Sequence, residues 1–230
     1  MSAYDKLFDV LKDSKVNDTR IYTTTMHPAD KTGVPLGNTI VTTNYDMSVE
    51  LYHSLREEPL YYGFRPTNNR YVEEMDINYY RENSTKKWLI KLHGAIWYFR
   101  QNDRVIKTIT DPNTTPFQIK IDDQMMIYPV GEKPILRYPY YLFYDIFKNQ
   151  IWRRMIAIGY SFRDEPVNIA ILENLEMYKD SKLIIVNPKP EDVIVNLGEQ
   201  AERFEDQIIS VSGKFGDTHI YSEIKNACAR

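Results

Sequence analysis

Cysteine and glycine are both scarce in this sequence. One cysteine, Cys228, and nine glycines are present among 230 residues. A single cysteine excludes an internal disulfide and a four-cysteine zinc site, and it suits a reducing cytoplasm. The four histidines are scattered, and neither a His-Glu-x-x-His nor a Cys-x-x-Cys motif occurs, so we expect no metal site. Nine glycines also leave little material for a glycine-rich phosphate loop.

Long apolar runs and an excess of positive charge are missing as well. No run approaches the roughly 20 apolar residues of a membrane span, and residues 1–10 lack the apolar region of a secretory signal. Lys and Arg number 29 against 32 Asp and Glu, so the formal net charge is −3. That balance argues against a sequence-independent nucleic-acid binder. We therefore expect a cytoplasmic protein that binds neither membrane nor nucleic acid directly.

A series of short apolar runs predicts the strands of a buried sheet. Such runs, rich in β-branched residues, are typical of parallel strands that are covered on both faces. Helical patterns lie between them, and strands that alternate with helices predict an α/β fold. The expected strands are residues 39–43, 88–92, 155–159, 183–186 and 207–211. The expected helices lie around residues 47–55, 140–152 and 167–178.

These elements predict a single domain over residues 1–230 with a Rossmann-like, doubly wound and mostly parallel sheet. The stretch 98–139 breaks the alternation with five prolines and is expected to be an irregular insertion or small subdomain. Residues 57–85 are polar and are expected to form a long loop with one helical piece. The apolar face expected for the first helix consists of Met47, Leu51 and Leu55.

Polar residues follow four of the predicted strands at the point where each strand ends. In an open parallel sheet, ligands bind in the crevice beyond the carboxyl ends of the strands. The four endings therefore predict a single cleft to which all of them contribute. These endings are Thr42–Asp46, His93-Gly94, Gly159–Ser161 and Asn187-Pro188.

Each ending also has a purely structural explanation. Asn44 and Asp46 fit a turn and cap before a helix, and His93 fits a buried histidine with satisfied hydrogen bonds. Ser161 fits a helix cap, and Asn187 followed by proline fits the end of a strand. These alternatives stay open for each residue alone, but their joint occurrence at four strand ends favours a functional site.

The four endings, in this order, resemble those of the sirtuin-like domains, the NAD-dependent silent-information-regulator superfamily. They look most like the prokaryotic branch found in anti-phage defence proteins, whose strand ends read Thr-Thr-Asn-Tyr-Asp, Leu-His-Gly, Gly-Tyr-Ser and Asn-Pro. The resemblance covers about residues 39–190. It implies a NAD-binding domain of the NAD glycohydrolase type, which converts NAD to ADP-ribose and nicotinamide without a metal.

The resemblance also implies a role for each strand end. Asn44 would hold the nicotinamide ribose and position a water molecule. His93 would act as the general base, and a histidine suits that task near physiological pH. The other residues would contact the carboxamide, the riboses and the phosphates of the dinucleotide. The implied cofactor-binding residues are Thr43, Asp46, Gly159, Ser161 and Asn187.

Two features of the family are missing from this sequence. Sirtuin deacetylases carry a four-cysteine zinc ribbon, and its absence argues against a zinc-dependent protein deacetylase. The family also begins with a strand and a Gly-Ala-Gly loop that binds pyrophosphate, and residues 1–38 contain no such loop. The chain therefore resembles a domain without its first βα unit, as a fragment, a truncated product or a degenerate member.

The missing unit has two expected consequences. Little or no NAD hydrolysis is expected from the chain alone, because the pyrophosphate anchor is absent. An open sheet edge is expected to pair with a second copy or with a partner chain. A non-catalytic module, which binds a nucleotide or serves as a protein-interaction subunit, therefore stays open as the alternative to the enzyme. An unrelated Rossmann-like protein is the third possibility.

Overall fold

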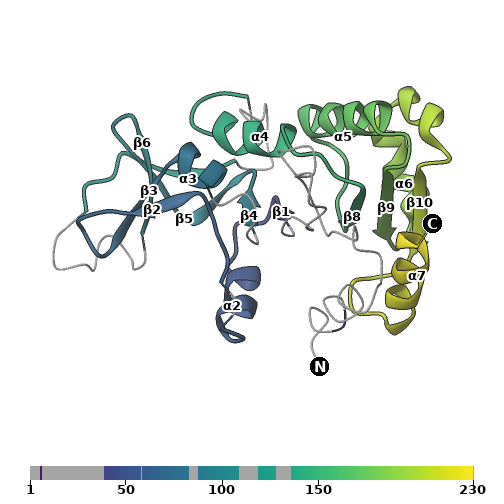
Figure 1. Ribbon diagram of the computed structural model, residues 1–230, viewed down its shortest axis with the longest axis horizontal. Helices are drawn as coiled ribbons and strands as arrows, with labels where there is room; N and C mark the ends of the chain where they lie inside the picture. Colours follow the sequence, from purple (N-terminus) through teal and green to yellow (C-terminus); the bar gives the residue numbers. More distant parts are fainter. Residues whose placement is uncertain are drawn as a thin grey trace. The chain divides into compact units, whose positions relative to one another are not determined.

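The computed structural model describes residues 6, 39–57, 59–82, 88–108, 119–127 and 136–229. The chain divides into two compact units (Figure 1). Residues 1–39 and 148–230 form the parallel-sheet unit, and residues 40–147 form the antiparallel-sheet unit. Residues 1–38, where the sequence contains no glycine-rich loop, lie outside the described residues except for Lys6.

The parallel-sheet unit is built on three adjacent parallel strands in the order β10-β9-β8. Leu183 on the central strand lies opposite Met155 on one side and Ile208 on the other. The three apolar runs predicted in this part of the sequence are therefore confirmed as strands. Their bounds are β8 (Arg154–Ile158), β9 (Lys182–Asn187) and β10 (Ile208–Ser212).

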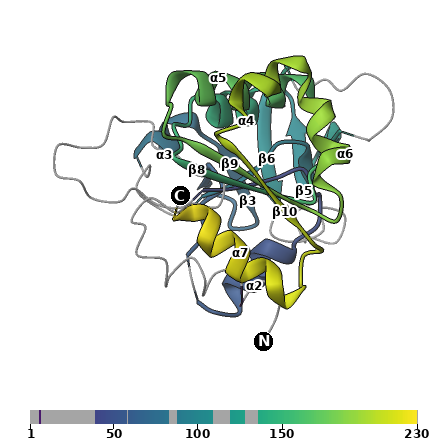
Figure 2. The same cartoon turned by 90° about the vertical axis from the view of Figure 1, so that its right-hand side faces the viewer.

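Helices cover both faces of this sheet, as Figure 2 shows for α5 on one side and α7 on the other. Ile184 on β9 and Ile220 on α7 belong to one buried cluster between the sheet and that helix. Leu175 on α5 is fully buried as well. The helices are α5 (Glu165–Met177), α6 (Pro190–Ile194) and α7 (Thr218–Cys228), with 3₁₀ helices η1 (Val195–Leu197) and η2 (Glu199–Phe204).

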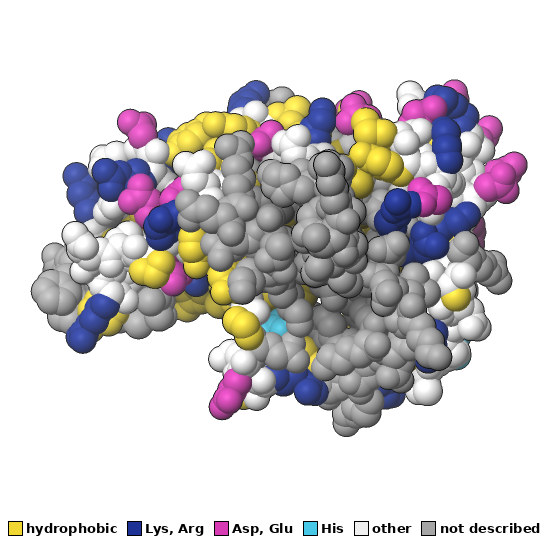
Figure 3. All heavy atoms as spheres, in the orientation of Figure 1, with side chains coloured by type: hydrophobic (Ala, Val, Ile, Leu, Met, Phe, Trp, Pro, Cys, Tyr) yellow, Lys and Arg dark blue, Asp and Glu magenta, His cyan; other side chains and the backbone are white. Residues whose placement is uncertain are grey.

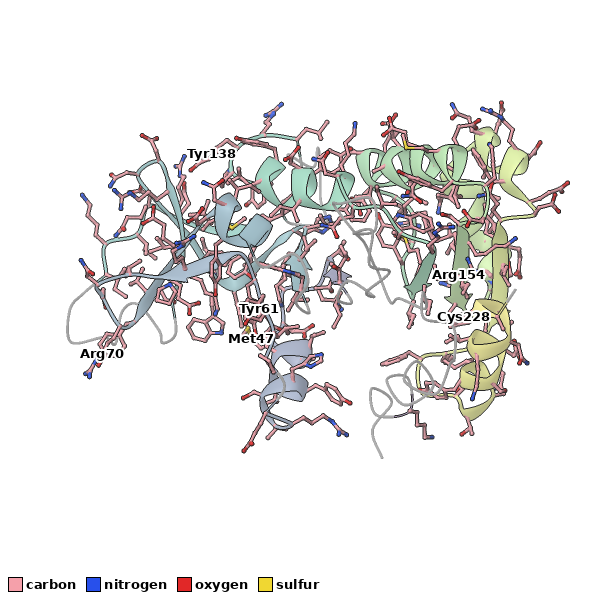
Figure 4. All side chains as sticks on the ribbon, viewed as in Figure 1. Met47, Tyr61, Arg70, Tyr138, Arg154 and Cys228 are labelled. Carbon is pink, nitrogen blue, oxygen red and sulfur yellow. The ribbon has the colours of Figure 1, made fainter. Side chains whose placement is uncertain are left out.

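The single cysteine has a packing role at the end of α7. Cys228 is buried in the cluster beneath that helix. Its carbonyl oxygen accepts a hydrogen bond from Nε of Arg154 at 3.1 Å, and Figure 4 labels both residues. The same guanidinium donates to the carbonyl oxygen of Asp180 at 2.8 Å. Arg154 therefore ties the start of β8 to the end of α7.

The antiparallel-sheet unit contains a five-stranded sheet in the order β2-β3-β6-β5-β7 and a separate pair, β1-β4. Phe99 on β5 and Ile106 on β6 face each other and form a small core with Val72. The strands are β1 (Thr39–Thr42), β2 (Phe64–Pro66), β3 (Val72–Met75), β4 (Trp88–Lys91), β5 (Gly94–Gln101), β6 (Arg104–Thr108) and β7 (Asp123–Met126). The helices are α2 (Ser48–Ser54), α3 (Ile77–Glu82) and α4 (Tyr141–Lys148).

The long loop expected over residues 57–85 is wrong, because this stretch supplies the strands β2 and β3, whereas the helical piece expected within it is present as α3. Its polar residues are used in the sheet. Glu73 and Glu74 on β3 form ion pairs with Lys107 and Arg104 on β6 at 2.8 Å and 3.1 Å. Cross-strand pairs of opposite charge stabilise a sheet, so a polar stretch can form strands without an apolar run.

Helix α2 is present as predicted, but its buried face is the opposite of the predicted one. Leu51 is 59% exposed and Leu55 is 78% exposed, whereas Glu50 and His53 are buried. The reason is an ion pair between Glu50 and Lys91 of β4. The buried face of α2 is therefore the face whose glutamate pairs with the buried Lys91.

The alternation of strands and helices confirms the α/β, Rossmann-like fold class. On the face shown in Figure 3, basic and acidic side chains of the described residues are mixed. This mixture agrees with the small formal net charge of −3. Among the described helices, none has both the length and the apolar character needed to cross a membrane.

Candidate functional site

The segment after β1 is shaped by its own side chains. Oγ1 of Thr42 accepts a hydrogen bond from the N–H of Asn44 at 3.0 Å. Oδ1 of Asp46 accepts one from the N–H of Ser48 at 2.8 Å, at the start of α2. Short polar side chains make such turns because they reach the backbone two residues away. Asp46 thus forms the turn that its structural explanation predicts, and both Asn44 and Asp46 are exposed.

The charge of Asp46 is favoured by its surroundings. Hydrogen bonds from the side chain and backbone of Ser48 hold the pKa of Asp46 below its ordinary value of 3.8. The Lys91 ammonium acts in the same direction, and partial burial opposes both. The carboxylate is therefore ionised at neutral pH and accepts hydrogen bonds only.

His93 lies in the tight turn between β4 and β5, and it is 5% exposed. The next residue, Gly94, has a φ of +78°, and a Cβ there would collide with the carbonyl oxygen of Met125. Only glycine avoids both the strained backbone and this collision. The glycine of the Leu-His-Gly motif is therefore required by the way the turn packs against β7.

Two backbone hydrogen bonds join the segment after β1 to the turn after β4. The N–H of Leu92 donates to the carbonyl oxygen of Thr42 at 3.0 Å, and the N–H of Ile96 donates to that of Tyr45 at 3.3 Å. Asn44 lies between the two acceptors in sequence, and the histidine of the turn lies between the two donors. The structure thus places the two predicted catalytic residues on neighbouring segments of one unit.

Tyr45 adds a third connection through the end of β7. Its hydroxyl donates a hydrogen bond to the carbonyl oxygen of Ile127. The N–H of Ile127 in turn donates to the carbonyl oxygen of His93 at 2.9 Å. Ile127 therefore connects the side chain of Tyr45, the residue after Asn44, to the backbone of His93.

A buried ion pair lies beneath the same segment, and the sequence analysis missed it. Nζ of Lys91 is 3.0 Å from Oε1 of Glu50 and also donates to the backbone carbonyl oxygen of Asp46. The available signal was a lysine within the apolar run Trp88–Leu92. A charged residue inside a buried strand needs a partner, but the sequence does not say which one.

In the parallel-sheet unit, the Gly-Tyr-Ser motif follows β8. Gly159 has a φ of +63°, and its N–H donates to the carbonyl oxygen of Val186 on β9 at 3.0 Å. The hydroxyl of Tyr160 donates to Oδ2 of Asp164 at 3.0 Å. Asp164 occupies the N-cap position of α5 but forms no side-chain cap hydrogen bond there. Its carboxylate instead holds the preceding loop.

Two asparagines fix the backbone at Ser161 and Phe162. Nδ2 of Asn168 donates to the carbonyl oxygens of Phe162 at 2.8 Å and Asn196 at 2.9 Å. Nδ2 of Asn196 donates to the carbonyl oxygen of Ser161 at 2.8 Å. Phe162 is fully buried with a φ of +52°, a conformation that costs free energy outside glycine. The asparagines therefore hold the serine loop in one strained conformation.

Asn187, the last residue of β9, accepts one hydrogen bond with its side chain and one with its backbone. Its Oδ1 accepts a hydrogen bond from the N–H of Lys189 at 3.0 Å, and its carbonyl oxygen accepts one from Gly213 at 3.0 Å. The first bond forms a turn that leads into α6. The structural explanation of Asn187 as a strand terminator thus fits the structure.

The predicted site residues fall into two sets, one in each unit. One set follows β1 and β4, and the other follows β8 and β9. The expectation that both sets face one cleft stays a prediction. Among the described residues, no group of three or more His, Cys, Asp or Glu side chains could hold a metal ion. The sets are Thr43, Asn44, Asp46 and His93, and Gly159, Ser161 and Asn187.

Comparison with known proteins identifies the family. The family model of the SIR2-like domain matches residues 38–211, which is more than half of the chain. This range contains both sets of predicted site residues. No curated protein matches the sequence significantly. With the strand ends and their loops arranged as described, the chain belongs to the SIR2-like domain family.

Proposed function

We propose that the chain is a NAD-binding domain of the NAD glycohydrolase type. In this reaction the bond between the nicotinamide nitrogen and ribose C1′ breaks, and a water oxygen bonds to C1′. The water proton goes to a base, and the products are nicotinamide and ADP-ribose. The observation that carries the proposal is the hydrogen-bonded pairing of the Asn44 segment with the His93 turn in a SIR2-like domain.

Asn44 and His93 are the proposed catalytic residues. Cleavage passes through an oxocarbenium-like transition state, so the protein must hold a water molecule and accept its proton. Asn44 offers both an amide donor and a carbonyl acceptor from a fixed, exposed segment, which suits orientation of the ribose and the water. His93 is the proposed general base, a role that contributes about 10²–10⁴-fold to a rate.

Asp46 and Thr43 are proposed to bind the nicotinamide end of the substrate. The Asp46 carboxylate is exposed and ionised, and its position is fixed by the N–H of Ser48. An ionised carboxylate can accept a hydrogen bond from the amide nitrogen of a carboxamide. Thr43 lies in the same segment, next to the proposed ribose-binding Asn44.

The loops after β8 and β9 are proposed to bind the phosphates and the adenosine ribose. At Gly159, no atom of the described residues, apart from Gly159 and its two chain neighbours, lies within 4 Å of where a Cβ would be, so the backbone there is open to a ligand. Ser161 is exposed and its carbonyl oxygen is fixed by Asn196. Asn187 lies at the carboxyl end of a parallel strand, where ligands bind in open α/β sheets.

The test is the release of nicotinamide from NAD by the full chain and by Asn44→Ala and His93→Ala. We expect little release, at most slightly above the protein-free rate, because residues 1–38 contain no Gly-Ala-Gly loop. Each substitution should reduce the part of the release that exceeds the protein-free rate by about 10²-fold or more. Asn78→Ala, an exposed asparagine on α3, is the matched control and should release nicotinamide like the unmodified chain. Release that is unaffected by His93→Ala would refute the proposed chemistry.

The scarcity of glycine supports one alternative, a non-catalytic module that binds the dinucleotide or serves as an interaction subunit. Titration calorimetry with NAD separates the two functions. Binding without nicotinamide release indicates the module, whereas release lost in both variants indicates the enzyme. A role in prokaryotic anti-phage defence belongs to the same proposal and is supported by the Thr-Thr-Asn-Tyr-Asp, Leu-His-Gly and Gly-Tyr-Ser strand ends.

A further inference from the structure

Lys91 is one of the most deeply buried side chains of the protein, with 1% of its surface exposed. It is the last residue of β4, and the turn that carries His93 begins directly after it. Lysine is almost never fully buried without a partner, because the loss of hydration costs several kcal/mol per ion. The Lys91 ammonium is therefore a buried charge directly beside the turn of the proposed site.

Within the described part of the chain, the Lys91 ammonium contacts both the segment after β1 and the helix α2 that follows it. It lies 3.0 Å from Oε1 of Glu50 in the first turn of α2. It also donates a hydrogen bond to the backbone carbonyl oxygen of Asp46, two residues after Asn44. One buried charge therefore joins the end of the His93 strand to the segment that carries Asn44 and Asp46.

Helix α2 depends on this ion pair for its orientation. Its leucines are exposed, and the carboxylate of Glu50 is on the buried side. Oε2 of Glu50 is buried and has no hydrogen-bond partner among the described residues. The pKa of the buried Tyr98 hydroxyl is raised, mainly by burial and next by the negative charge of Glu50. The Glu50 carboxylate therefore lies near a part of the interior that holds little water. The apolar stripe of the sequence alone predicts that the other face of this helix is buried.

A buried ion pair is weak evidence for stability, because apolar residues of similar size are often as stabilising. An arrangement that costs hydration and leaves a carboxylate oxygen unpaired calls for another explanation. We propose that Lys91, through Glu50 and the Asp46 carbonyl oxygen, is a positioning residue that fixes the Asn44–Asp46 segment relative to His93. This inference rests on the proposed NAD glycohydrolase function.

The test removes both charges together. Lys91→Met alone leaves the Glu50 carboxylate buried without its cation and is expected to destabilise the fold severely. The double variant Lys91→Met/Glu50→Leu replaces the pair by apolar side chains and should unfold at a urea concentration close to that of the unmodified chain. Because misplacement of reacting groups can cost about 10²-fold in rate, its kcat for nicotinamide release should fall by about that factor. The KM should change less.

A second ion pair of the same unit supplies the matched control. Lys107 and Glu73 lie 2.8 Å apart on β6 and β3, and neither is a proposed site residue. Lys107→Met/Glu73→Leu should keep the kcat of the unmodified chain. If Lys91→Met/Glu50→Leu recovers both stability and kcat, the buried pair is only structural and the inference is wrong.

A second measurement is independent of NAD hydrolysis. Amide hydrogen exchange of the peptide that contains Asn44–Met47 reports how firmly the segment is held. We expect exchange in this peptide to be at least about tenfold faster in Lys91→Met/Glu50→Leu than in the control pair, with the rest of the unit unchanged. Equal exchange in the two double variants would overturn the inference. If the exchange differs but the unmodified chain releases no nicotinamide, the positioning role holds and the proposed function fails.

Discussion

The hydroxyl of Tyr45 donates a hydrogen bond to the carbonyl oxygen of Ile127, whose N–H holds the carbonyl oxygen of His93 at 2.9 Å. The tyrosine of the Thr-Thr-Asn-Tyr-Asp motif therefore reaches the histidine of the Leu-His-Gly motif through a single residue after β7. Two motifs that are about fifty residues apart in the sequence are linked by this contact.

Tyr45→Phe tests this link, because it removes the hydroxyl and keeps the ring. Ile127 is buried, and its carbonyl oxygen would lose the Tyr45 donor. The free energy of unfolding should fall by about 1–2 kcal/mol, and nicotinamide release should slow because the His93 turn is held less firmly. Urea unfolding and the release assay measure the two effects. An unchanged unfolding midpoint would show that the bond contributes nothing.

Gly94→Ala should destabilise the chain more than Gly159→Ala. Both glycines have positive φ, +78° and +63°, and alanine costs roughly 1–2 kcal/mol there. At Gly94 the added Cβ also collides with the carbonyl oxygen of Met125, whereas the space at Gly159 is open. The difference between the free energies of unfolding of the two variants gives the free-energy cost of the collision at Gly94. Equal losses would mean that β7 moves aside without cost.

Asn168→Asp should destabilise the loop after β8. The substitution keeps the shape of the side chain but replaces the amide that donates to the Phe162 and Asn196 carbonyl oxygens. Leaving such buried groups unsatisfied costs about 1–3 kcal/mol each, so we expect a loss of at least that size in urea unfolding. Asn78→Asp on exposed α3 is the control and should stay within about 0.5 kcal/mol. Similar losses in both variants would contradict the clamping role.

The stabilisation by Asp46 should depend on pH. Its pKa in the folded chain lies below the ordinary value of 3.8, chiefly because Ser48 donates hydrogen bonds to the carboxylate. A group with a lowered folded pKa stabilises the fold above its unfolded pKa, and this contribution is lost as the pH falls through the folded pKa. The unmodified chain should therefore have a larger free energy of unfolding than Asp46→Asn at neutral pH, and this difference should disappear in acid. A difference in the free energy of unfolding that is constant with pH, measured by urea unfolding, would exclude this charge effect.

The fold class and the strands β1, β4, β8, β9 and β10 could be predicted because their signal is local. Runs such as Leu183–Val186 are apolar at every position and rich in β-branched residues, as is typical of a strand covered on both faces. The motif residues were found for a related reason, since each directly follows such a run. The alternation of apolar runs with helical patterns then indicated the α/β class.

The orientation of α2 and the role of Lys91 could not be predicted, because they depend on a contact across the fold. Leu51 and Leu55 have the spacing of a buried stripe, but the Glu50–Lys91 ion pair turns them outward. The partners of that pair are about forty residues apart, and nothing in the local sequence joins them. Similarly, the glutamates of β3 form ion pairs with basic residues of β6. This explains why β3 can be polar, but the sequence does not show that the two strands pair.

Hydrogen exchange of the His93→Ala variant, measured with and without NAD, tests the central claim most directly. This variant is expected to leave the dinucleotide intact, so that binding can be observed without turnover. The account predicts that NAD slows exchange both in the peptide of Asn44–Met47 and in the peptide of Gly159–Phe162, because both sets of site residues are proposed to bind NAD. Protection of neither peptide, or protection confined to another part of the chain, would contradict a NAD site built from these strand ends.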